Sequence, residues 1–264
     1  MGGTPSLHSA PVQLTVLGSN GTYPTPGHPA SGYLVDHGGT MVWLDTGPGT
    51  LPAVMAGPGV GAIDAIVLSH AHLDHCSDLF PLLNVFRFAV VRTAVPVMCP
   101  AGLPDRFAAF LEVDEGHALF RVFAFDEVAP GDEREAGGLR LRFGEATHPV
   151  PALATRLDGG GRSIVYSGDT GPGGDLEALA SGADLLLCEA TLQGEPAVDR
   201  YPYHLFAAEA GAVAAAAGVG RLVVTHVAPT LDPAVAVAEA AAAFGGPVIH
   251  AVPGLQIDLE EEKG

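Results

Sequence analysis

Basic residues are scarce in this chain of 264 residues, which has 12 of them and only one lysine, Lys263. Thirty acidic residues outnumber them, so the net charge is −18 at pH 7. Nucleic-acid binding normally relies on clustered lysines and arginines that neutralise phosphates, and no such cluster is present. A long polyanion such as folded RNA is repelled by this charge. The composition therefore favours a small-molecule substrate over a large nucleic acid.

Cysteine is also scarce, and the three present are widely spaced, at Cys76, Cys99 and Cys188. This number and spacing argue against a disulfide framework and for a reducing compartment. No stretch reaches the roughly 18 uninterrupted apolar residues of a membrane helix. The N-terminus lacks the basic region and apolar core of a signal peptide. We therefore expect a cytoplasmic protein without a membrane partner.

What the chain does have is material for a core, since 48% of its residues are hydrophobic and only 16% are charged. Strands alternating with helices in both halves predict an α/β layered fold. No linker divides the chain, so we expect one domain over 1–264. Apolar runs predict helices at 51–56, 78–88, 207–217 and 234–244, one ending near 111, and strands at 12–16, 32–35, 41–44, 65–68, 95–98, 139–143, 153–156, 164–167, 185–188, 222–225, 248–251 and 255–259. The stretch 114–138 shows no sustained period.

The most informative motif is Ser69-His70-Ala71-His72-Leu73-Asp74-His75, which follows a buried strand. Residues two apart in an extended chain point to the same side, so His70 and His72 can reach one metal together. Asp74 and His75 come at the approach to a helix and are aimed at a second point nearby. Two adjacent metals are used to hydrolyse phosphate esters and other hard bonds. A charged surface loop that happens to carry histidines is the alternative reading.

Four more acidic or imidazole side chains follow apolar runs along the chain: His148, Asp169, Glu189 and His226. Strand ends are the usual place for a site in an α/β fold. Any one of these residues alone is more often a capping or surface residue. Four of them in the same kind of position indicate a shared site.

With Asp45 in Leu-Asp-Thr-Gly, these motifs resemble the metallo-β-lactamase superfamily over the whole chain. The resemblance implies a four-layer αββα sandwich with two metals at one edge of the sheets. Seven residues would hold the metals: His70, His72 and His148 the first, Asp74, His75 and His226 the second, with Asp169 bridging them. Asp45 would orient ligands by hydrogen bonds. A donor set of nitrogen and oxygen suits two divalent ions, Zn²⁺ first, with Mn²⁺ or Fe²⁺ as alternatives.

Glu189-Ala190-Thr191, followed by His204 before Glu209-Ala210-Gly211, resembles the ribonuclease Z branch, which cleaves phosphodiesters. In that branch the equivalents of Glu189 and His204 form a pair near the scissile phosphate and bind no metal. The resemblance implies catalytic roles for Asp74, His204 and Glu189. An imidazole held by a carboxylate can stabilise developing charge or protonate the leaving oxygen. The alternative for His204 is an ordinary residue at a helix start.

Transfer-RNA-processing members of that branch carry a protruding arm between the third and fourth motifs. Here His148 and Asp169 are 21 positions apart, enough for two strands and a turn at 158–161. The openings at 16–21 and 29–34 resemble armless relatives, the actinobacterial cyclic-nucleotide phosphodiesterases. We therefore expect a binuclear metal-dependent phosphodiester hydrolase acting on a small substrate, with a cyclic nucleotide as the first choice.

Three alternatives remain open from the sequence. One is a ribonuclease Z-type RNA 3′-processing endonuclease. Another is a thioesterase, lactonase or β-lactamase on the same fold, none of which needs the Glu189 and His204 pair. A third is a non-catalytic metal-binding scaffold, against which the full ligand set argues. A homodimer formed through the apolar helix 79–88 also stays open, although a helix facing the core is the simpler account.

Overall fold

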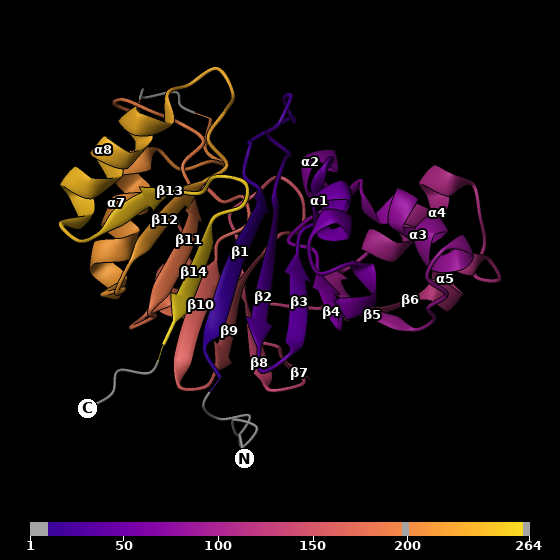
Figure 1. Ribbon diagram of the computed structural model, residues 1–264. Coiled ribbons are helices and arrows are strands. Elements are labelled where there is room, and N and C mark those ends of the chain that lie inside the picture. Colours follow the sequence, from indigo (N-terminus) through magenta and orange to yellow (C-terminus); the bar gives the residue numbers. More distant parts are fainter. Residues whose placement is uncertain (1–9, 197–200, 261–264) are drawn as a thin grey trace, which may run out of the picture.

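The structure is a computed structural model that describes residues 10–196 and 201–260. In this part of the chain two seven-stranded sheets face each other (Figure 1). The first sheet consists, in spatial order, of β14 (Gln256–Leu259), β1 (Val12–Gly18), β2 (Gly32–His37), β3 (Thr40–Leu44), β4 (Ala65–Val67), β5 (Val95–Pro100) and β6 (Phe123–Val128). The second consists of β13 (Val248–His250), β12 (Leu222–Thr225), β11 (Leu185–Glu189), β10 (Arg162–Tyr166), β9 (Leu153–Gly159), β8 (Leu139–Glu145) and β7 (Glu133–Ala136).

Each sheet is antiparallel in one half and parallel in the other, and the burial of the strands follows this division. β1 pairs antiparallel with β2 and alternates buried with half-buried residues over its first half, as a strand with one covered face does. β11 pairs parallel with both β10 and β12 and is buried along its whole length. An uninterrupted apolar run such as Leu185–Cys188 therefore marks a strand covered on both faces.

Three clusters of buried apolar side chains fill the spaces between the layers. The central cluster lies between the sheets and includes Leu14, Val35, Phe143, Tyr166 and Leu187. The other two lie under the helices outside each sheet. The first sheet carries α1 (Thr50–Ala56), η2 (Val60–Ala62), α2 (Leu73–Cys76), α3 (Leu79–Phe88), α4 (Leu103–Leu111) and α5 (Ala118–Val122); the second carries α6 (Leu176–Ala180), α7 (Ala207–Ala217) and α8 (Pro233–Phe244). The layers run helix, sheet, sheet, helix (Figure 1), which confirms the predicted αββα sandwich.

The main differences from the sequence-based prediction lie in short elements. The unassigned stretch 114–138 forms α5, β6 and β7, of which β6 is one of the two edge strands of the first sheet and β7 one of the two of the second. β7 reads Glu-Arg-Glu-Ala, and its charged residues suit an exposed edge but hide the strand pattern. The ends of the expected 1–264 domain, Lys263 among them, lie outside the described residues.

The connection between His148 and Asp169 is a plain hairpin. β9 and β10 pair antiparallel from Arg162 opposite Gly159 to Tyr166 opposite Thr155. Only Gly160 and Gly161 turn the chain, and both have positive φ, 53° and 72°. A two-residue turn with positive φ at both positions favours glycine. The predicted pair of strands is therefore confirmed, and it leaves no protruding arm between these two residues.

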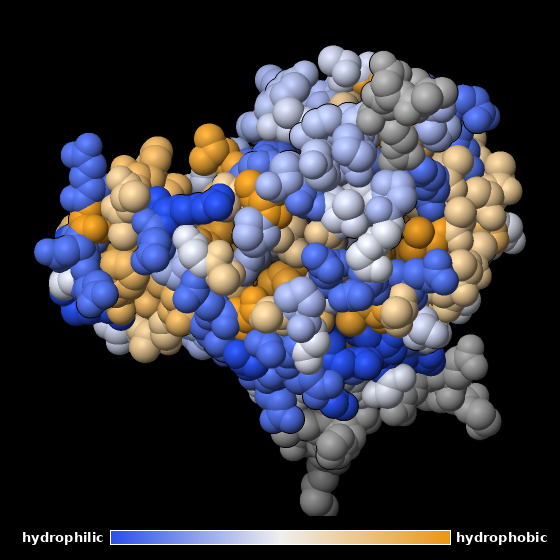
Figure 2. All heavy atoms as spheres, turned by 180° about the vertical axis from the view of Figure 1, so that it is seen from behind, coloured by the Kyte–Doolittle hydropathy of each residue, from blue (hydrophilic) through white to orange (hydrophobic). Residues whose placement is uncertain are grey.

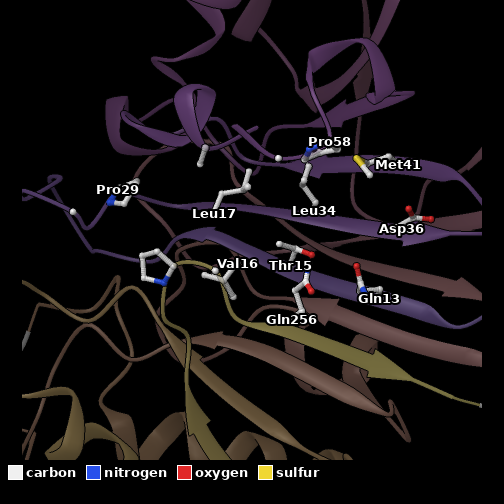
Figure 3. Close-up of a pocket in the computed structure, with 15 residues that line it drawn as sticks. Gln13, Thr15, Val16, Leu17, Pro29, Leu34, Asp36, Met41, Pro58 and Gln256 are labelled. Carbon is white, nitrogen blue, oxygen red and sulfur yellow. The ribbon is translucent and has the colours of Figure 1, made fainter. Parts of the chain in front are cut away.

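The surface seen from behind mixes hydrophilic and apolar side chains, with hydrophilic ones gathered along the lower edge (Figure 2). Among the described residues, no helix is both long and apolar enough to cross a membrane. A groove of about 590 Å³ lies on the outer face of the first sheet beside α1 (Figure 3). Thr15 of β1 and Gln256 of β14 lie side by side in it, and the seven predicted metal ligands are all absent from its lining.

The contact between α7 and α8 gives a test of the outer layer. A Cβ atom added at Gly211 would lie 2.2 Å from the carbonyl oxygen of Ala240. Gly211→Ala should therefore lower the free energy of unfolding by about 1–3 kcal/mol through overpacking, although alanine is intrinsically the better helix former. Chemical denaturation measures the change. The exposed neighbour Ala212 is the control, since Ala212→Gly should lose only the propensity term of about 1 kcal/mol. A stabilised Gly211→Ala protein would contradict the close packing.

Candidate metal centre

Residues that follow strands of both sheets meet at one edge of the sandwich. Asp45 follows β3, and His70 and His72 come shortly after β4. From the second sheet, Asp169 follows β10 and His226 follows β12. Asp45 and His226 both have φ of 54°, a left-handed conformation that is uncommon for residues other than glycine. Strained backbone of this kind concentrates at functional sites, where the surrounding structure holds it in place.

The first group of donor atoms belongs to His70, His72, His148 and Asp169, and these atoms all lie within 4.8 Å of one another. His148 Nε2 is 3.1 Å from His72 Nδ1. His70 Nε2 is 3.7 Å from Asp169 Oδ2. His70 and Asp169 are buried, whereas His72 and His148 are half-buried and face the outside.

The second group belongs to Asp74, His75, Asp169 and His226, again within 4.8 Å of one another. His75 Nε2 is 3.2 Å from His226 Nε2 and 3.2 Å from Asp169 Oδ1. Asp74 Oδ2 is 3.3 Å from His226 Nε2. The short helix α2 turns Asp74 and His75 towards the same point. Asp169 is the one residue common to both groups, with one oxygen near each.

The two donor groups contain five histidines, and in four of them Nδ1 faces a hydrogen-bond acceptor on the side away from the centre. His70 Nδ1 is 3.0 Å from Ser69 Oγ, and Ser69 Oγ itself donates to Asp45. His75 Nδ1 is 2.7 Å from Asp45 Oδ2. Because an acceptor at Nδ1 favours the proton there, both rings direct the lone pair of Nε2 into the centre.

The other two histidines are oriented from the second sheet. His148 Nδ1 is 3.2 Å from the backbone oxygen of Tyr203. His226 Nδ1 is 2.8 Å from Thr191 Oγ1, which donates to Glu189 at 2.5 Å. His72 differs from these four, since its Nδ1 is the atom that faces His148.

The Asp45 carboxylate is fully buried and accepts four hydrogen bonds. Oδ1 accepts from the Ser69 backbone at 2.7 Å. Oδ2 accepts from Ser69 Oγ, His75 Nδ1 and Tyr166 Oη, each at 2.7 Å. Tyr166 belongs to the second sheet, so this carboxylate connects the two sheets directly behind the centre.

The pKa shifts of the residues in the centre indicate that a bound cation is favourable there. Burial, reinforced by His75, holds the pKa of His70 well below its usual range, and burial lowers the pKa of His148 to about 4. Burial also opposes the charged form of His75, but Asp169 and Asp45 outweigh it and raise the pKa of His75 well above its usual range. The pKa of Asp169 is held well below its usual range, against burial, by His226 and His75. A cation between the aspartates is therefore favourable.

The donor atoms also have the spacing that metal ions require. Ligand atoms at about 2.0 Å from a tetrahedral zinc are about 3.3 Å apart, close to the nitrogen pairs described above. His70 Nε2 is buried and has no hydrogen-bond partner among the described residues. A buried nitrogen without a partner is costly unless a bound group satisfies it. The residues present therefore fit two divalent metals.

Glu189 and His204 lie next to the second group. His204 Nδ1 is 2.9 Å from Glu189 Oε1, and Glu189 is fully buried. The same carboxylate accepts from the backbone nitrogens of Thr170 and Leu205. Burial opposes the charged form of His204, but the hydrogen bond to Glu189 and the negative charges of Glu189 and Asp169 together outweigh it and raise the pKa of His204. Glu189 also reaches His226 through Thr191, and the donor atoms of Glu189, His204 and His226 lie within 4.8 Å of one another.

The structure brings all nine predicted site residues together, in the two groups and the pair that the resemblance implied: His70, His72, Asp74, His75, His148, Asp169, Glu189, His204 and His226. Their roles in metal binding and catalysis stay predictions. Sequence reasoning gave no role to Ser69, Tyr166, Thr191 or Tyr203. Each of these orients a site residue through one hydroxyl or carbonyl, and only contact across the fold reveals such a role.

Two facing sheets with helices outside and a histidine–aspartate cluster at one edge define the class of αββα metal-dependent hydrolases. The family model described as a beta-lactamase superfamily domain matches residues 40–227. The chain belongs to the metallo-β-lactamase superfamily.

Relatives agree with a ribonuclease Z-like branch. An uncharacterized protein of Mycobacterium leprae is 36% identical over 260 residues, covering 94% of this chain and 89% of that protein. The ribonuclease Z of Mycolicibacterium paratuberculosis is 33% identical over 245 residues, covering 83% and 87%.

Solved structures agree on the fold. The metallo-β-lactamase fold protein YhfI of Bacillus subtilis superimposes with a TM-score of 0.83 at 26% identity, covering 95% of this chain and all of that one. The short form of human tRNase Z has a TM-score of 0.72 at 22% identity, covering 93% and 98%. A diphosphatase of the PhnP family has a TM-score of 0.73 at 20% identity, covering 94% and 98%. For the last two structures, at 22% and 20% identity, the likeness shows the fold alone.

The ligand set predicts a metal count. The wild-type protein should hold two divalent ions per chain, measured by mass spectrometry after stripping with a chelator and reloading with zinc. His148→Ala should hold about one, because only the first group loses a donor. Asp169→Ala should lose both, since it serves each group. His250→Ala, a half-buried histidine of β13, is the control. A His148→Ala protein that keeps two ions would remove His148 from the ligand set.

The Asp45 carboxylate predicts a second effect. In Asp45→Asn an amide nitrogen replaces an oxygen that receives hydrogen bonds, whichever way the amide turns, so a buried donor faces a donor. Metal affinity should fall about 10- to 100-fold because His75 loses its anchor. Zinc titration with a competing chelator measures it. Tyr166→Phe, which removes one of the four donors, should have a smaller effect. Unchanged affinity in Asp45→Asn would show that His75 needs no such anchor.

Proposed function

We propose that this protein is a binuclear metal-dependent phosphodiesterase that acts on a small substrate, with a cyclic nucleotide as the first choice. The observation that carries the proposal is the hydrogen-bonded pair of His204 and Glu189 beside both donor groups. The ring of His204 lies 5.4 Å from that of His148 and 5.7 Å from that of His226. A substrate that spans the two groups therefore has an imidazole within reach of its leaving oxygen.

Each residue then has a defined task. The two divalent ions would activate water as a nucleophile at neutral pH and neutralise charge on the phosphate. Asp74 is 13% exposed at its side chain and faces the open side of the second group, where it can accept the proton that the attacking water loses. His204, held at Nδ1 by Glu189, delivers a proton from Nε2 to the leaving oxygen. Glu189 holds the ring in the orientation that this transfer needs.

Three observations support a small substrate. The hairpin between His148 and Asp169 ends in a two-residue turn. The net charge of −18 disfavours a long polyanion. A cavity of about 420 Å³ lies beside His148, walled by Pro100, Pro149 and Pro151 among others. This volume is in the range of small-molecule sites.

A ribonuclease Z activity is the second candidate, favoured by relatives of that name at 30–33% identity. Both activities would use the same metal centre and the same His204. They differ in what surrounds the scissile phosphate, so precursor tRNA is the substrate that separates them. Cleavage of precursor tRNA faster than any cyclic nucleotide would overturn the preference for a small substrate.

We further propose that the chain works as one domain, in the cytoplasm and with zinc as its metal. Three cysteines, all free and buried, suit a reducing compartment. Imidazole and carboxylate donors at tetrahedral spacing suit zinc. A homodimer remains an open part of this proposal.

The task given to His204 predicts a dependence on the leaving group. With a 3′,5′-cyclic nucleotide, whose leaving alkoxide needs a proton, His204→Ala should lower kcat about 10²- to 10⁴-fold. With bis(p-nitrophenyl) phosphate, whose leaving group departs as an anion, the loss should be much smaller. Metal content should stay at the wild-type level in both experiments.

His250→Ala serves again as the matched histidine control and should leave both substrates unaffected. Asp74→Ala should lower activity on both substrates and also reduce metal content. An equal loss on the two substrates in His204→Ala would argue against proton transfer. Full activity on both would remove His204 from the mechanism.

A further inference from the structure

A row of three neighbouring rings leads from the surface to the metal centre, the outer contact tilted and the inner one stacked. The ring of Tyr201 lies 5.8 Å from that of His204, with 31° between their planes. His204 in turn stacks on His226 at 5.7 Å and 19°. Tyr201 is 56% exposed, whereas His226, which belongs to the second donor group, is 2% exposed. The outermost ring of this row therefore offers its surface to solvent next to His204.

The two residues that follow Tyr201 pack against the centre. A Cβ atom added at Gly171 would lie 1.8 Å from the backbone oxygen of Pro202, so the two backbones touch. The backbone oxygen of Tyr203 faces His148 Nδ1 at 3.2 Å. The ring of Tyr203 meets that of Tyr201 edge to face at 5.3 Å and 76°. Tyr201 is thus held on two sides, and a side chain placed in advance loses little entropy on binding.

We propose that Tyr201 is the stacking platform for a planar ring of the substrate, most simply a nucleobase, on the side of the phosphate nearest His204. The inference rests on the phosphodiesterase proposed above and specifies its substrate as a diester that carries such a ring. Stacking on an aromatic side chain needs no positive charge and accepts every base through its π-face. It therefore suits a protein whose net charge is −18.

The test compares ligands that differ only in the base, on protein reloaded with zinc. Tyr201→Ala should bind adenosine 5′-monophosphate about five- to hundredfold more weakly, while its affinity for ribose 5-phosphate should not change. Tyr201→Phe should keep nucleotide affinity within about twofold, because the ring remains. KM for a cyclic nucleotide should rise in Tyr201→Ala more than kcat falls. Phe88→Ala, another exposed aromatic residue, is the control.

A direct readout is also available. The only tryptophan, Trp43, is fully buried, so its fluorescence emission should not respond to a ligand bound next to Tyr201. Tyr201→Trp adds an exposed indole, and its emission should change on adding adenosine 5′-monophosphate but not ribose 5-phosphate. An indole that responds to neither ligand would contradict stacking at this position.

Two results would overturn the platform. One is a Tyr201→Ala protein that prefers the base as strongly as the wild type. The other is a loss of base preference in Ala101→Leu instead, which would place the ring in the cavity beside His148, since Ala101 lines it. If no diester is hydrolysed but the base preference depends on Tyr201, the proposed function fails and the ring site stands. Hydrolysis without base preference leaves the function and removes the platform.

Discussion

The buried carboxylate of Asp45 is the interaction on which the rest of the centre depends. A carboxylate without solvent is tolerable only when donors surround it, and Asp45 receives them from the end of β4, from α2 and from the second sheet. Its left-handed backbone turns the chain so that one oxygen can meet three donors. The carboxylate thereby links the two sheets at the edge where both donor groups form.

Function in this protein follows from how its histidines are supported. Four of the five imidazoles in the two donor groups have one nitrogen directed at the centre and the other held, and the holders are a serine, an aspartate, a threonine and a backbone carbonyl. Such supports control the tautomer and the ring orientation, which set how well a ligand binds. His204, the proton donor in the proposed function, is held in the same way by Glu189.

The sequence predicted those parts that leave a periodic or local pattern. Buried parallel strands such as Leu185–Glu189 appear as apolar runs, and the spacing of His70, His72, Asp74 and His75 carries its chemistry within seven residues. The edge strand Glu133–Ala136 was missed because exposed charges replace alternation. Contacts such as Tyr166 with Asp45, 121 residues apart, leave no local trace. They depend on how two sheets pack, which a single sequence does not display.

Glu189 is shared, since it holds His204 directly and His226 through the hydroxyl of Thr191. A substitution of Glu189 that changes the hydrogen bonding of His204 therefore also disturbs His226, a residue of the second donor group. A substitution at Glu189 is therefore expected to change the surroundings of both histidines at once. Divergence towards new substrates, in nature or in directed evolution, is expected first at exposed positions such as Tyr201, whose ring contacts His204 from outside the hydrogen bonds of the buried carboxylate.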